Sequence, residues 1–124
     1  MSEAHSLHAV DGRFWRGVEH FDAGDYFAAH ELWESLWLEV AGAEKVFLAG
    51  LIQVAAGLLK RSQGRIVGAT RLLTRSRARL AETAVATPVD IVAVCDCLRR
   101  ELVDIESGLP SQPWSLPLTG PRPG

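Results

Sequence analysis

The run from Val46 to Leu59 constrains the fold most, because Gln53 is its only polar side chain. The run is shorter than the roughly 20 apolar residues that a membrane-spanning helix needs. A helix that is apolar on nearly every side is one that other helices surround. We therefore expect a central helix from Glu44 to about Gln63 in an all-α bundle, with no membrane-spanning segment.

Apolar residues at helical spacing predict four further helices around this one. Gly24 is expected to end the first helix and Asp25 to cap the second. Thr87 is expected to cap the last helix, with Pro88 in its first position and Asp90 completing a capping box. The four helices are expected over residues 7–21, 26–40, 65–84 and 88–107.

A chain of 124 residues is expected to form one domain. The helical bundle is predicted over residues 1–109, and residues 110–124 are rich in proline, which predicts an extended tail. Trp114 indicates that this tail packs along the bundle. Two cysteines that are two residues apart on a helix do not readily pair with each other. Reduced thiols and a cytoplasmic location are therefore expected.

Two polar residues lie among the tryptophans of the second helix. His30 and Glu34 are four residues apart, so they lie on the same side of the helix and can contact each other. A helical wheel places both inside the apolar arc, where an unsatisfied polar group costs about 1–3 kcal/mol. The lone Gln53 of the central helix is the expected partner. We predict a buried polar pocket made by His30, Glu34 and Gln53 and lined by Tyr26, Trp33, Trp37 and Lys60.

A polar pocket in apolar surroundings is typical of a site that binds or processes a small molecule. In an enzyme, His30 and Glu34 would serve as acid and base, with Gln53 beside them and no cofactor. One alternative is a helical interaction module in which the polar cluster only fixes the helix register. The sequence leaves open whether the protein is an enzyme and whether it forms homo-oligomers.

The basic stretch of the fourth helix offers a second alternative. Residues 45–81 hold eight basic residues and no acidic one, and an arginine stripe of this kind is able to bind phosphate or nucleic acid. The acidic residues of the first two helices oppose a strong anion-binding field, so nucleic acid is not the expected partner. The stripe consists of Arg71, Arg75 and Arg79, with Arg61, Arg65 and Arg77 nearby.

The segment from His30 to Glu34 is similar to the His-Glu-x-x-His pattern of zinc proteases, with Glu34 in place of the second histidine. In that interpretation His30 and Glu34 would be metal ligands and Glu31 the base. Glu31 is expected to point toward solvent, and no third ligand is evident. No metal site is therefore predicted; His30 and Glu34 are its candidate ligands, with His20 as a remote third.

Two stretches of the chain carry a more specific pattern. The first, FDAGDYFAAHELWESLW, holds a Gly-x-Tyr-x-x-x-His-Glu-x-x-Glu-x-x-Trp core, and the second holds Gly-Leu-Ile-Gln followed by Gly-Ala. Both resemble the small helical family known as domain of unknown function 309. The resemblance implies an all-helical fold and groups His30, Glu34 and Gln53 in one constellation, but it implies no reaction. The chain departs from the family pattern at Lys60, where a histidine is expected, and at Arg65, where an asparagine is expected.

Overall fold

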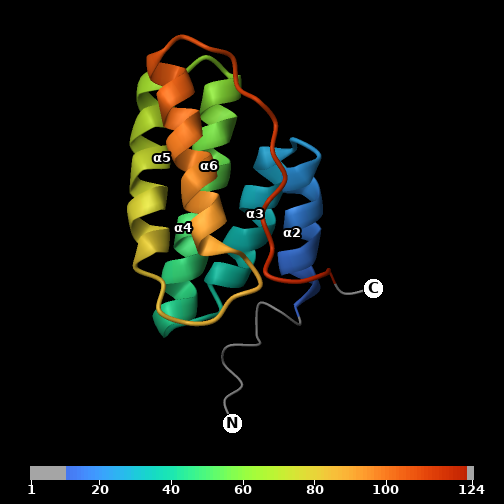
Figure 1. Ribbon diagram of the computed structural model, residues 1–124. Coiled ribbons are helices and arrows are strands. Elements are labelled where there is room, and N and C mark those ends of the chain that lie inside the picture. Colours follow the sequence, from blue (N-terminus) through green and yellow to red (C-terminus); the bar gives the residue numbers. More distant parts are fainter. Residues whose placement is uncertain (1–10, 123–124) are drawn as a thin grey trace.

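The computed structural model describes residues 11–122, in which the helices pack side by side (Figure 1). Within these residues no strand is present, and one isolated bridge joins Val89 and Leu118. The predicted all-α bundle is confirmed. Its helices are α2 (Gly12–Asp22), α3 (Tyr26–Trp37), α4 (Gly42–Ser62), α5 (Ile66–Ala81) and α6 (Ile91–Glu106).

The first two of these helices form the predicted hairpin. Gly24 adopts a left-handed backbone conformation, with φ of 82°, and the Asp25 side chain accepts a hydrogen bond from the Ala28 amide at 3.2 Å. Asp11 caps α2 in the same way, by accepting from the Arg13 amide at 2.8 Å. The residues expected to start the first helix, 7–10, lie outside the described part of the chain.

Trp33 fills the space between α2, α3 and α4. Its side chain is fully buried, and its indole Nε1 donates to the Phe14 carbonyl at 3.1 Å. Gly17 lies under this ring, since a Cβ at that position would sit 2.2 Å from Nε1 of Trp33. The rings of Phe14 and Phe21 lie 6.3 and 6.0 Å from that of Trp33. Trp33 is therefore a core residue.

α4 packs most closely against α5, at the face that carries Gly50 and Gly57. A Cβ at Gly50 would lie 2.7 Å from Leu80, and one at Gly57 would lie 2.8 Å from Leu73. By length and composition alone, α4 would also be able to cross a membrane, but half of its apolar window is buried inside the bundle. Its apolar composition is therefore what a central helix requires.

The last helix begins later than predicted, because the tail competes for its first residues. Asp90, and not Thr87, is the N-cap of α6, and its side chain accepts from the Ala93 amide at 3.1 Å. The Asp90 amide instead donates to the Pro117 carbonyl at 3.0 Å, next to the bridge between Val89 and Leu118. A capping motif read from local sequence cannot include this long-range pairing.

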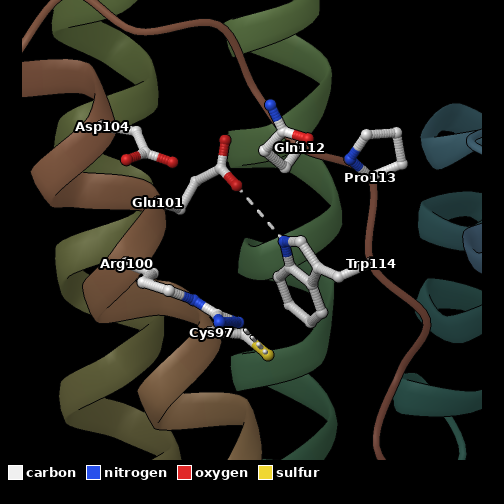
Figure 2. Close-up of a pocket in the computed structure, with 7 residues that line it drawn as sticks. All are labelled: Cys97, Arg100, Glu101, Asp104, Gln112, Pro113 and Trp114. Atoms are coloured by element: carbon white, nitrogen blue, oxygen red, sulfur yellow. Dashed lines mark hydrogen bonds between the residues drawn. The ribbon is translucent and has the colours of Figure 1, made fainter.

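The chain after α6 runs along the bundle from the end of α6 toward α2 (Figure 1). Glu101, which is 3% exposed, holds it in place. Its carboxylate accepts from the Arg61 guanidinium at 2.7 Å, from the Ser111 hydroxyl at 2.6 Å and from the Trp114 indole at 3.2 Å; Figure 2 shows the last of these bonds. Further along, Leu116 is buried.

We expect Glu101→Gln to lower the free energy of unfolding by about 3–5 kcal/mol, because the buried charge of Arg61 then loses its anion. Urea unfolding followed by circular dichroism measures the effect. Asp96→Asn is the matched control, since Asp96 pairs with Arg99 at 3.9 Å on the surface. The control is expected to change stability by no more than about 0.5 kcal/mol. Equal losses in the two variants would contradict the proposed anchoring of the tail.

Candidate functional site

A groove on the surface of the bundle is bounded by α3 and by α5, with α4 as its floor. One hollow in it, of about 280 Å³, is lined by residues of all three helices. A second hollow, of about 380 Å³, lies further along α4 toward the start of α5. We call these two hollows the α3–α5 groove. The first is lined by Glu34, Trp37, Ala49, Ile52, Gln53 and Arg79, and the second by Phe27, His30, Ala56, Leu59, Lys60, Gln63 and Arg65.

The three polar residues of the predicted constellation do lie at this groove, but they do not form a buried pocket. Glu34 and Gln53 line the first hollow, and His30 lines the second. The side chain of His30 is 25% exposed, and Glu34 is exposed. The prediction of a buried cluster was therefore wrong for Glu34. The helical wheel gave the direction in which Glu34 points from the axis of α3. At Glu34, however, α4 does not cover that side of α3, so the side chain stays exposed.

Two of the predicted lining residues lie elsewhere. Trp33 faces α2 in the core, as described above. Tyr26 packs edge-on against the ring of Phe21 at 5.3 Å. Burial, together with the negative charges of Glu101 and Asp22, raises the pKa of the Tyr26 phenol. Neither side chain lines the groove, so this part of the predicted lining was wrong.

Trp37 and Lys60 do line the groove, at opposite ends. Trp37 shares a hollow with Gln53, and Lys45 lies over its ring at 4.0 Å from the centroid. Lys60 shares a hollow with His30. The groove also includes Arg65 and Arg79, which the sequence grouped with the basic stretch and not with the polar cluster. The arginine stripe was visible in the sequence, but the packing of α5 on α4 decides which of its members turn toward α3.

Three polar atoms of the groove residues are buried and have no hydrogen-bond partner among residues 11–122. They are Nδ1 of His30, Nε1 of Trp37 and Oε1 of Gln53. Nδ1 of His30 lies 3.4 Å from Oε2 of Glu31, without the geometry of a hydrogen bond. Each such atom costs about 1–3 kcal/mol when nothing satisfies it. Three side chains that line the groove thus carry an unsatisfied indole donor, amide acceptor and imidazole nitrogen, and protein atoms cover each of these three atoms.

One face of α3 also gathers three side chains that are able to hold a metal ion. One ligand atom each of His30, Glu31 and Glu34 lies within 4.8 Å of the others. The sequence interpretation placed Glu31 in solvent and found no third ligand, whereas in the structure the exposed Glu31 carboxylate reaches this cluster. Imidazole and carboxylate groups are ligands of zinc, manganese and other divalent ions.

Another hollow, of about 250 Å³, lies between α6 and the tail and is drawn in Figure 2. Its central carboxylate, Glu101, is already bonded to Arg61, Ser111 and Trp114. The Arg100 guanidinium points to the Cys97 sulfur at 3.6 Å. Because its central carboxylate already has three partners, this hollow is a less favourable site than the groove.

The two cysteines are free, and neither lines the α3–α5 groove. Burial raises the pKa of the Cys95 thiol, which opposes formation of the reactive thiolate. This gives no support to a nucleophilic role for Cys95.

The comparison with protein families agrees with the resemblance that the motifs carry. Residues 14–72, just under half of the chain, match the model described as Domain of unknown function (DUF309). The match covers most of α2, all of α3 and α4, and the first part of α5. It therefore includes every groove residue except Arg79. The comparison with curated proteins found no match.

We expect Glu34→Gln to leave the stability at pH 7 unchanged to within about 0.5 kcal/mol, because the side chain is exposed and has no partner among residues 11–122. The urea midpoint of this variant, compared with that of Glu101→Gln, provides the measurement. A loss of more than about 1 kcal/mol would instead indicate that Glu34 forms a stabilising charge pair with His30.

Proposed function

We propose that the α3–α5 groove binds a small molecule and that His30 and Glu34 carry out acid–base chemistry on it. The observation that carries this proposal is the set of three unsatisfied buried atoms on His30, Trp37 and Gln53. A bound molecule with a hydrogen-bond acceptor near Trp37 and a donor near Gln53 would satisfy two of them once these side chains turn the buried atoms toward the groove. Such a molecule extends along α4 toward the imidazole.

The chemical roles follow from the surroundings of each group. Imidazole exchanges its proton near neutral pH, so His30 is suited to donate or accept a proton within the groove. Glu34 lies one helical turn further on, where its exposed carboxylate is suited to act as the base. Gln53 has no ionisable group, and its carboxamide is suited to orient the molecule.

The structural alternative, in which the cluster only fixes helix register, receives less support. A structural network stabilises a bundle when its members satisfy one another. Here Gln53 and His30 keep buried atoms without partners, and Glu34 faces solvent. This arrangement resembles a binding surface more than a closed network.

We expect the wild-type protein to bind members of a metabolite mixture in ligand-observed NMR, and Ala49→Leu and Ala56→Leu to abolish that binding. Both alanines line the groove, so a larger side chain fills the space. Ala78→Leu is the matched control, because Ala78 lines a different hollow, between α5 and α6. Binding that survives both groove variants, or that Ala78→Leu weakens equally, would contradict the proposal.

A second candidate function is metal-assisted chemistry, which the convergence of His30, Glu31 and Glu34 favours. In this version the ion would sit on α3 at the edge of the groove and activate a water molecule. The exposed carboxylates would supply its charge, and the imidazole its nitrogen ligand.

In that case we expect zinc or manganese at 100 times its dissociation constant to stabilise the wild type by about 2.7 kcal/mol and to raise its melting temperature. His30→Ala should remove the shift. His20→Ala is the control, because it deletes an imidazole of α2 that lies beside Asp25 and does not belong to the cluster of His30, Glu31 and Glu34. No shift in the wild type, or the same shift in both variants, would exclude the metal version.

A further inference from the structure

We infer that the end of the groove near the start of α5 binds the phosphate group of a small phosphorylated molecule. This inference rests on the proposed function and adds the class of molecule that the groove would take. It begins from the two cations, Lys60 and Arg65, that line the same hollow as His30.

These two cations have no counter-charge in the described part of the chain. Within residues 11–122 neither side chain has a carboxylate within ion-pair distance, and no acidic residue lines their hollow. By contrast, Arg13 bonds to both Asp11 and Glu39, and Arg61 bonds to Glu101. The positive charge at this end of the groove is therefore available to a ligand.

The backbone of α5 helps to hold one of these cations in place. Gly68 has no side chain, and a Cβ there would lie 2.8 Å from Cδ of Lys60 and 3.9 Å from its Nζ. The stem of Lys60 therefore packs against the first turn of α5 and carries its ammonium group to that turn. A larger residue at position 68 would displace the lysine.

The donors at this end match a phosphate group better than a monoanion. Lys60 offers an ammonium group, Arg65 a planar guanidinium fork that suits two phosphate oxygens, and Gln63 an amide. A phosphate ester carries about −1.5 to −2 charges at pH 7, which two cations balance. Glu34 lines the other hollow and no acidic residue lines this one, so repulsion from Glu34 favours the phosphate at the α5 end.

The position of the phosphate then orients the rest of the molecule. From Lys60 and Arg65 the groove passes Ala56 and His30 and continues toward Gln53. A phosphate fixed at one end places the attached organic group beside the imidazole. The two hollows would thus bind the two parts of one ligand.

The test is titration of wild type and variants with inorganic phosphate and with glycerol 2-phosphate, by calorimetry at low salt. We expect saturable binding that weakens as salt is added and that falls about tenfold in Arg65→Gln, the loss of one charge-assisted bond. Lys60→Met should show a similar loss with an unchanged melting temperature. Arg71→Gln is the matched control, because it removes the same charge from an exposed position of α5 that lines neither hollow of the groove. Its affinity should stay within about twofold of wild type.

Absence of saturable binding in the wild type, or equal losses in Arg65→Gln and Arg71→Gln, would overturn the inference. Tighter binding of a single-stranded oligonucleotide, weakened by both arginine variants, would overturn it in favour of a nucleic-acid surface.

The Ala49→Leu variant separates this inference from the proposed function, because the larger side chain fills only the hollow near Trp37. Phosphate should still bind to this variant, whereas the metabolite should not. Phosphate binding that persists while the wild type takes up no metabolite would refute the proposed function alone. Metabolite binding without phosphate binding would refute this inference alone.

Discussion

The burial of α4 is the constraint on which the rest of the structure depends, because an almost wholly apolar helix is stable only when its neighbours cover it. α5 approaches it closely at Gly50 and Gly57, where the leucines of α5 occupy the space that side chains would fill. α3 packs on another side of α4. Between these two contacts a strip of α4 stays only partly covered, and Ala49 and Ala56 on this strip are short enough to leave a groove.

The groove gathers polar groups because it is the edge of the core and not its centre. At such an edge, a side chain can turn one atom inward and leave the rest in contact with water. His30 does so, since its Nδ1 is buried while a quarter of the side chain is exposed. Gln53 and Trp37 likewise each have one buried polar atom without a partner among residues 11–122. A side chain at such an edge avoids the cost of burying a whole charge.

The charges of the two walls follow from the uneven distribution of charge along the chain. α3 contributes the carboxylate of Glu34 to the groove, whereas the charged residues that line it from α4, α5 and the turn between them, Lys60, Arg79 and Arg65, are all basic. On the other side of the bundle, Arg61 and Glu101 neutralise each other under the tail. The charges under the tail are therefore paired with each other. The basic residues that line the groove have no such partner among residues 11–122.

The sequence by itself determined the helices and the neighbours on each helix, because 3.6 residues per turn fix which side chains share a face. The all-apolar run predicts a central helix, and the spacing of His30 and Glu34 predicts that they lie together. Tertiary packing alone decided how far each face is covered. It left Glu34 exposed, placed the Trp33 side chain in the core against α2, and brought Arg79 to the groove. It also moved the cap of α6 to Asp90, because the tail pairs with the preceding residues. Periodicity gives a direction around one helix axis, but only the positions of the other helices decide whether that direction meets protein or water.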